Sequence, residues 1–118
     1  MEMDCSVYVD TRNLEWLRDF LCEALQGDLF SSSQVICSAA RIYVAHNDYE
    51  TDGNDPSDFI QWPSVLECEP LPEVENQDFV AFVNRLLQSI WGTERRAVAA
   101  CDFEDLLPNS GGRDLYVH

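Results

Sequence analysis

A chain of 118 residues, 46% hydrophobic and 25% charged, fits one folded domain with a core of ordinary size. Its 22 acidic residues outweigh 7 basic ones, which gives a formal net charge of −15. That balance argues against direct binding of nucleic acid, because Lys and Arg are needed to neutralise phosphates. It favours either simple solubility or long-range attraction to a basic partner.

The cysteines and the start of the chain point to a reducing compartment. No Cys-x-x-Cys pair occurs, so a zinc site is not predicted; the five cysteines are Cys5, Cys22, Cys37, Cys68 and Cys101. The first ten residues lack the basic start and apolar run of a secretory signal, and no apolar stretch is long enough for a bilayer. We therefore expect a cytoplasmic protein with free thiols and no membrane contact.

The chain begins with the patterns of a strand and a helix. Apolar and polar residues alternate over 5–10, which is typical of a half-buried strand. Four leucines then recur at helical spacing within 14–25, with Thr11 or Asn13 as the candidate N-cap. Gly27 stands where such a helix normally ends.

The middle of the chain predicts one bent strand between two loops. The serines at 31–33 indicate a loop, and alternation resumes over 35–46. A change of phase at 38–40 indicates a bulge or bend within one long strand. The polar, acidic segment 47–58 contains glycine and proline and is expected to be a loop between strands.

The second half predicts a strand, a helix and a last short strand. Ile60, Trp62, Leu66 and Cys68 are expected to share one face of a strand, with Pro63 at an edge or bulge. An apolar stripe over 76–91, closed by a glycine, indicates a helix. Residues 96–101 form a short strand pattern, 102–107 an acidic and apolar exit, and 109–118 a loosely held tail.

These elements run in the order β-α-β-β-α-β, which predicts the α+β class. Since each helix has one apolar stripe to bury, we expect a two-layer ferredoxin-like sandwich, with an antiparallel sheet and both helices on one face. The chain, 1–118, is then a single acidic binding domain. The other sheet face is left open and carries, by alternation, Tyr8, Arg41, Tyr43, Gln61 and Val65.

Catalytic chemistry finds little support in the residues. His46 is expected to be a core or rim side chain at a strand end, and His118 is terminal. No serine lies in a Gly-x-Ser-x-Gly motif, and no cysteine has an obvious basic neighbour to lower its pKa. Acids at alternate positions of 48–53 imitate the start of a calcium loop, but Phe59 replaces the glutamate that calcium requires at the twelfth position. We expect no enzyme activity, no metal and no cofactor.

Two acidic clusters are candidate surfaces for a basic partner, with solvated loops as the plain alternative. The first is an acidic finger in the 47–58 loop, where a tyrosine can serve as a rigid anchor; it consists of Asp48, Tyr49, Glu50, Asp52, Asp55 and Asp58. Tyr8 and Tyr43, which are expected on the open sheet face, are further candidates for contact with the partner.

The second cluster is expected at the opposite end of the sheet. It consists of Glu69, Glu73, Glu75, Asp102, Glu104 and Asp105. Phe103 and Leu106 are expected to hold Glu104 and Asp105 against the body of the domain.

The second half of the chain also resembles a known family. The segments concerned are 58–62, the phenylalanine-rich helix, and Ala97-Val98-Ala99-Ala100-Cys101-Asp102-Phe103-Glu104-Asp105, together with the alternating first strand that ends in Asp10. They resemble small acidic immunity proteins encoded beside polymorphic toxins of bacteria, of the contact-dependent type. The resemblance implies a cytoplasmic inhibitor that binds its cognate toxin one to one, without catalytic residues, by covering a basic surface or active-site cleft.

Two other classes of function remain open. The charge equally allows an acidic DNA mimic that inhibits a nucleic-acid-binding protein. A small ferredoxin-like ligand-binding or enzymatic domain would be favoured by a deep pocket that contains His46 or a cysteine beside an arginine. A homodimer through the open sheet face is also left open.

Overall fold

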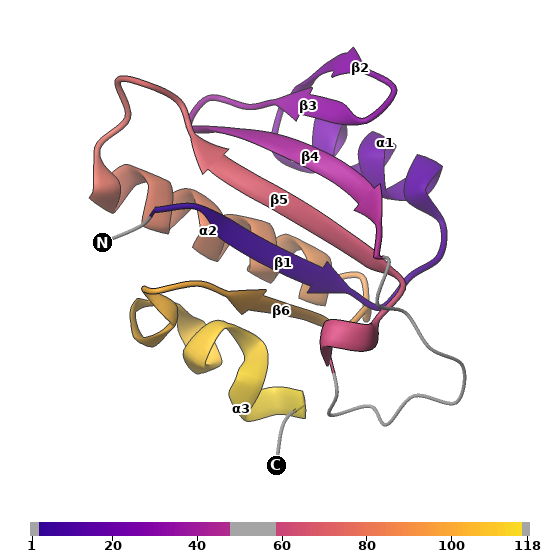
Figure 1. Ribbon diagram of the computed structural model, residues 1–118, viewed down its shortest axis with the longest axis vertical. Helices are drawn as coiled ribbons and strands as arrows, with labels where there is room; N and C mark the ends of the chain where they lie inside the picture. Colours follow the sequence, from indigo (N-terminus) through magenta and orange to yellow (C-terminus); the bar gives the residue numbers. More distant parts are fainter. Residues whose placement is uncertain (1–2, 48–58, 117–118) are drawn as a thin grey trace.

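A single antiparallel sheet organises the chain (Figure 1). The computed structural model describes residues 3–47 and 59–116, and within them six strands lie in the order β2-β3-β4-β5-β1-β6. The strands are β1 (Cys5–Val9), β2 (Asp28–Ser31), β3 (Gln34–Ile36), β4 (Ala40–His46), β5 (Ser64–Pro70) and β6 (Ala97–Ala100). The expected α+β class with an antiparallel sheet is confirmed.

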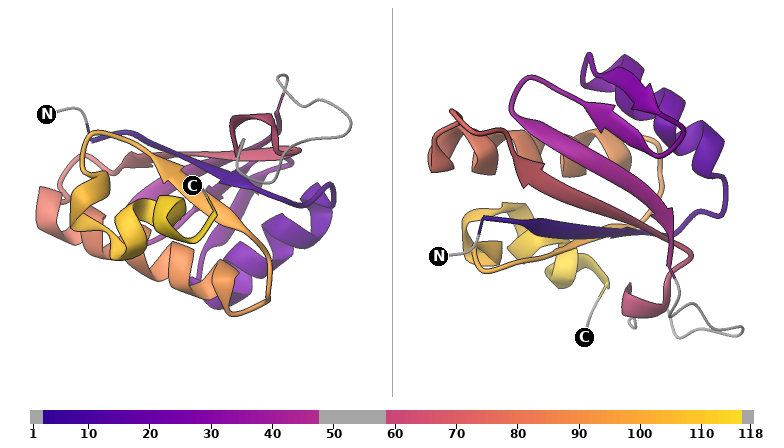
Figure 2. Two further views of the ribbon diagram at one scale, coloured as in Figure 1. Left: turned by 90° about the horizontal axis from the view of Figure 1, so that it is seen from below. Right: turned by 45° about the horizontal axis from the view of Figure 1, so that its top comes forward.

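Two long helices and several short ones accompany the sheet. The α-helices are α1 (Leu14–Ala24), α2 (Asn76–Trp91) and α3 (Arg113–Tyr116), and the 3₁₀ helices are η1 (Phe59–Gln61), η2 (Glu104–Leu106) and η3 (Pro108–Gly112). Figure 2 shows α1 and α2 beneath the sheet, whereas η1 lies on the other side of it. No helix in the described residues has the length and apolar run that a bilayer crossing requires.

Both long helices form where the sequence predicts them. The Asn13 side chain caps α1, since its Oδ1 accepts a hydrogen bond from the Trp16 N–H at 2.9 Å. Leu17 and Leu21 are buried on the sheet side of this helix. Helix α2 has the bounds expected from its apolar stripe, and its C-cap is Gly92.

The main core lies between these helices and the sheet. The strand residues that point toward the helices are fully or almost fully buried, as alternation requires. They pack against the apolar stripe of α2, which consists of Phe79, Phe82, Val83, Leu86, Leu87 and Ile90.

A second, smaller core covers part of the sheet face that was expected to be open. Phe59 and Trp62 pack on Val98 of β6, and Tyr8 and Tyr116 lie at the rim of this cluster. The Trp62 ring meets the Tyr116 ring edge to face, with centroids 5.6 Å apart. The open-face prediction is therefore wrong over β1 and β6, because η1 folds back over these two strands.

Residues 28–46 differ most from expectation. The segment 35–46 forms two strands, β3 and β4, rather than one bent strand, and Ile36 pairs with Arg41 across a tight turn. The Cys37 N–H donates to the Ala40 carbonyl at 2.8 Å and closes this turn. The phase change at 38–40 therefore marks a reversal of the chain, not a bulge. Ser32 and Ser33 form a turn, as the serine run indicates, but the residues before them form β2, an edge strand that the sequence pattern does not predict.

The strand expected over 60–68 begins later, at Ser64. Residues 59–61 form a 3₁₀ turn, in which Ile60 remains 49% exposed. Trp62 lies in the small core, on the opposite sheet face from Leu66, so the two side chains do not share a face. Proline at position 63 has no N–H to donate to a ladder, and the ladder starts directly after it.

The C-terminal segment also corrects a prediction, because residues 108–116 are folded rather than loosely held. Two glycines with positive φ, Gly111 (74°) and Gly112 (104°), are buried beside β6. A Cβ on Gly112 would lie 2.5 Å from the Ala97 carbonyl oxygen, so only glycine allows this approach. The outer edge of β6 is thereby covered, which protects it from pairing with another chain.

Candidate partner-binding surface

The second acidic cluster gathers at one end of the sheet. Strand β1 begins there, and β5 and β6 end there, since Cys5 pairs with Cys68 and Ser6 with Ala100. Figure 1 shows the N-terminus, the start of α2 and the segment after β6 at this end. The exposed carboxylates that flank these elements, called the acidic end below, are Asp4, Glu73, Glu75, Asp102 and Asp105.

An apolar hollow opens at the acidic end. Its volume is about 420 Å³, and it is lined by Met3, Asn76, Gln77, Val80 and Leu106. The Leu106 side chain is 61% exposed, whereas that of its neighbour Leu107 is buried. Apolar side chains surrounded by charged ones form the common arrangement of a protein interface, with a dry centre and a polar rim.

Phe103 fixes the turn that presents the carboxylates. Its side chain is fully buried, and its ring meets that of Phe79 edge to face with centroids 5.9 Å apart. The expectation that Phe103 holds this segment to the body is confirmed. The same expectation for Leu106 is wrong, because its side chain points largely into solvent.

Glu104 has a structural role that separates it from its acidic neighbours. Its Oε1 accepts a hydrogen bond from the Cys101 N–H at 3.1 Å, and its Oε2 lies 2.9 Å from Arg113 Nε. The carboxylate therefore joins the end of β6 to α3. Of the three acids predicted here, Asp102 and Asp105 are exposed, and Glu104 is engaged within the fold.

The two tyrosines predicted on the sheet face lie in different surroundings. Tyr8 is partly covered by Phe59, whose ring centroid is 5.6 Å from its own. Tyr43 lies on the uncovered part of the face, and its hydroxyl is 3.4 Å from Glu69 Oε1. The carboxylate of Glu69 also pairs with Arg41, which stands opposite it on β4. Among the described residues, the cluster around Phe59 and Trp62 contacts Tyr8 but does not include Tyr43.

The acidic finger falls outside the described residues. Its six predicted members lie within 48–58, and only the flanks of this segment are described. On the near flank, the Asn47 side chain donates to the carbonyl oxygens of Ile60 and Trp62, both at 2.7 Å. These two hydrogen bonds join the residue after β4 to the residues before β5, at the end of the sheet opposite to the acidic end.

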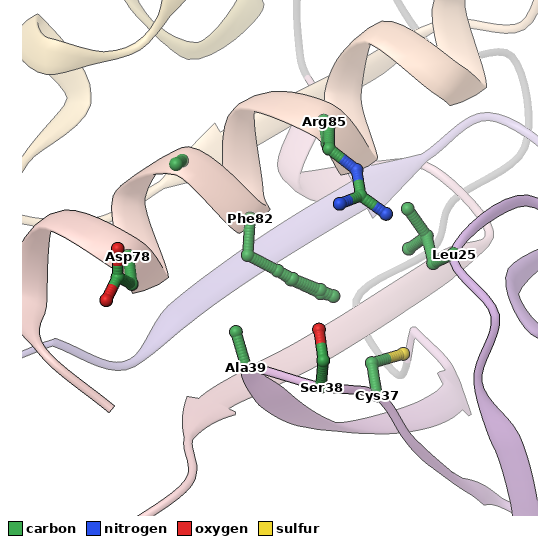
Figure 3. A pocket seen from close by; sticks show the side chains of 8 residues that line it. Leu25, Cys37, Ser38, Ala39, Asp78, Phe82 and Arg85 are labelled. Atoms are coloured by element: carbon green, nitrogen blue, oxygen red, sulfur yellow. The ribbon is translucent and has the colours of Figure 1, made fainter. Parts of the chain in front are cut away.

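A small cavity between α2 and the β3–β4 turn contains a cysteine beside an arginine (Figure 3). Its volume is about 200 Å³, below the ~300 Å³ at which ligand clefts usually begin. Burial raises the pKa of Cys37 to about 11, although Arg85 lowers it in part. The thiol is therefore protonated at neutral pH and is a weak nucleophile. Figure 3 shows Arg85 directed toward Leu25 and Cys37.

Metal ligands do not gather in the part of the chain that the structure describes. Within residues 3–47 and 59–116, no group of three or more His, Cys, Asp or Glu side chains is arranged to hold a metal ion. His46 is exposed at the end of β4, a rim position as expected. Because β2 is a sheet edge, Leu29 and Phe30 are also exposed, at 55% and 67%.

The sequence alone missed the apolar part of the candidate surface. Met3, Val80 and Leu106 come from three distant segments, and no periodic pattern connects them. The sequence offers Leu106 and Leu107 as neighbours, but it does not say that the first is exposed and the second buried. Comparison with known proteins finds no matching family, no matching curated protein and no matching solved structure.

Proposed function

We propose that this chain is an immunity protein, which binds a cognate bacterial toxin in the cytoplasm and neutralises it by covering a basic surface or active-site cleft. The observation that carries the proposal is the acidic end, where exposed carboxylates surround an apolar hollow. Such a surface suits a partner that has a basic rim around a protruding apolar side chain. The resemblance of the second half of the chain to immunity proteins supplies the class of partner.

The two parts of the acidic end have separate roles in this proposal. Exposed carboxylates such as Asp102 and Asp105 attract a basic partner over a distance and mainly raise the association rate. The apolar hollow around Leu106 is desolvated on contact and mainly slows dissociation.

We also propose that strands β1, β4, β5 and β6 form a ferredoxin-like core. Strands β4-β5-β1-β6 are consecutive in the sheet, and α1 and α2 lie in the chain between β1 and β4 and between β5 and β6. The β2–β3 hairpin then extends this core at its β4 edge. Such a core leaves both ends of the sheet accessible to a partner.

Co-expression tests the function. The chain is expressed together with the toxin encoded beside its gene, and the expected result is cell survival and a one-to-one complex on size-exclusion chromatography. A toxin that kills equally well in the presence of the chain, with no complex, would overturn the proposal. Competition for the toxin by duplex DNA would instead favour an acidic DNA mimic.

Matched variants test the surface. The double variant Asp102→Asn and Asp105→Asn removes two charges at the acidic end, and Asp19→Asn with Glu23→Gln removes two exposed charges on α1. The first pair should reduce the association rate several-fold at low salt, and the second pair should have a smaller effect. Leu106→Ser should raise the dissociation rate. If all three variants bind like the wild type, the interface lies elsewhere on the chain.

A further inference from the structure

Two cysteines face each other across the first and last strands. The β1–β6 register ends with Ser6 opposite Ala100, and its extension by one residue places Cys5 opposite Cys101, which directly follows β6. The interaction of the two thiols raises the pKa of Cys5 and lowers that of Cys101. Cys5 is buried, whereas Cys101 is partly exposed, so solvent reaches one side of the pair.

The ladder geometry makes this pair a close one. In the same ladder, the Asp10 N–H donates to the carbonyl of Arg96, its direct partner, at 3.0 Å. Hydrogen-bonded and non-hydrogen-bonded pairs alternate along an antiparallel ladder, so the Cys5–Cys101 pair, five steps away, is non-hydrogen-bonded. The Cys101 N–H accordingly donates elsewhere, to Glu104. The Cα atoms of such pairs are about 4.5 Å apart, within the range of about 4.4–6.8 Å that a disulfide spans.

The other neighbour of Cys5 is less suited to a disulfide. Cys68 stands opposite Cys5 on β5. Successive residues of β1 direct their backbone groups to alternate sides, so this pair is hydrogen-bonded and its side chains are farther apart. The Cys68 thiol lies 3.9 Å from the Leu66 carbonyl oxygen, to which it donates, and both thiols of this pair are buried.

We propose that Cys5 and Cys101 form a redox site, in which a peroxide joins them in a reversible disulfide between β1 and the segment after β6. The proposal goes beyond the proposed function and does not depend on a partner. Cys101 is the attacking residue because it is the accessible member of the pair, and Cys5 resolves the intermediate.

The electrostatic surroundings agree with these roles. Hydrogen bonds from the Cys5 thiol and the Phe103 N–H lower the pKa of Cys101, against the opposing effects of burial and of the Glu104 and Asp102 carboxylates. The pKa of Cys5 is raised, chiefly by its hydrogen bond to Cys101 and by burial. Cys101 is therefore the member of the pair that more readily becomes a thiolate, the reactive form.

The chemistry balances with peroxide as the oxidant. The Cys101 thiolate attacks one peroxide oxygen, the O–O bond breaks, and the sulfenic acid forms while hydroxide leaves and is protonated to water. The Cys5 sulfur then attacks the Cys101 sulfur, the S–O bond breaks, and a second water leaves with the Cys5 proton. Two thiols are oxidised to one disulfide, and one hydrogen peroxide is reduced to two waters.

Mass spectrometry of the full chain tests the proposal. The purified, reduced protein is treated with hydrogen peroxide at about one equivalent, its remaining thiols are alkylated in denaturant, and it is digested. We expect one cross-linked peptide pair containing Cys5 and Cys101, lighter by two hydrogen atoms, which dithiothreitol separates. The cross-link closes most of the chain into a loop, so the midpoint of thermal unfolding should rise by roughly 10 °C.

Serine variants identify the roles of the two thiols. Cys5→Ser should trap Cys101 as a sulfenic acid that dimedone labels, whereas Cys101→Ser should abolish both the label and the cross-link. Cys22→Ser, which removes the other partly exposed thiol, is the control and should leave the cross-link intact. The wild-type chain alone can overturn the proposal. It does so if it forms no cross-link, or if it links Cys5 to Cys68 instead.

Discussion

Replacement of Trp62 by alanine should destabilise the protein severely, although this residue lies outside the main core. The side chain is 1% exposed, and it packs against Phe59, Val98 and Tyr116 on the sheet face opposite α1 and α2. Truncation of a buried tryptophan costs about 3–5 kcal/mol in free energy of unfolding. Since a domain of this size loses about 4 °C in melting temperature per kcal/mol, the expected shift is roughly 12–20 °C.

Urea unfolding followed by far-UV circular dichroism measures this cost. Ile60→Ala is the matched control, because Ile60 lies in the same 3₁₀ turn but is half exposed, and it should cost under about 1 kcal/mol. Trp62→Phe should fall between the two, because the indole N–H is buried and has no hydrogen-bond partner among the described residues. Should Trp62→Ala unfold within 1 kcal/mol of the wild type, the small core would contribute nothing, and the sheet face would be open after all.

Three further substitutions test other contacts. Gly112→Ala, which forces a Cβ against the Ala97 carbonyl at positive φ, should cost about 2–4 kcal/mol by urea unfolding, whereas Gly92→Ala, with ordinary backbone angles, should cost under about 1 kcal/mol. Glu104→Ala should lower the free energy of unfolding by about 1–2 kcal/mol. Glu104→Gln should lower it less, because the glutamine side chain still accepts a hydrogen bond from the Cys101 N–H. If both variants lost the same free energy, the effect would come from the charge alone. Burial raises the pKa of Cys37 from 9.0 to about 11, so its thiol contributes stability that is fully present below pH 9 and is lost as pH rises through 11. Between pH 8 and 11, the free energy of unfolding of the wild type should therefore fall by about 2 kcal/mol more than that of Cys37→Ala. If the two free energies fell equally with pH, the Cys37 thiol would not have a raised pKa.

The helices could be predicted from the sequence because their signals are local. Helix α2 has an apolar stripe long enough to set its phase, with a glycine at its end, and its bounds follow directly. The side chain of Asn13 determines where α1 begins, through a hydrogen bond to a residue three positions away. Neither feature requires knowledge of what the helix packs against.

The hairpin could not be predicted in the same way. All four residues of β2 are exposed, so burial imposes no alternation on them. The turn at 38–39 contains neither glycine nor proline, and a reversal there leaves the same change of phase as a bulge. The sheet face of Trp62 was predicted wrongly for a related reason. An aromatic residue in the sequence indicates a core, but it does not indicate which face of the sheet that core covers.

The candidate surface was predicted in its charges but not in its shape. Carboxylates near a loop can be read directly from the sequence, and Asp102 and Asp105 are exposed as expected. Glu104 has the same chemistry but lies within reach of Arg113, nine residues away, which only the folded C-terminal segment brings near. The apolar hollow depends on three segments meeting at the end of the sheet.

Two of the seven arginines are engaged within the fold. Arg96 pairs with Asp10, and its guanidinium also lies 5.2 Å from the Trp62 ring centroid. Arg113 pairs with Glu104 and lies 4.8 Å from the ring centroid of Phe59. These cations hold the small core and the C-terminal segment in place, so they are not available to neutralise the acidic end.

In the proposed complex, the toxin supplies the positive charge that the chain uses internally. Exposed charges attract through solvent only within about 10 Å at 0.1 M salt, so the association rate should fall steeply as salt rises. The internal arginine pairs, which are in direct contact and partly buried, should be screened much less. If salt slowed association only slightly while the complex stayed intact, the carboxylates of the acidic end would serve solubility, and recognition would reside in the apolar hollow.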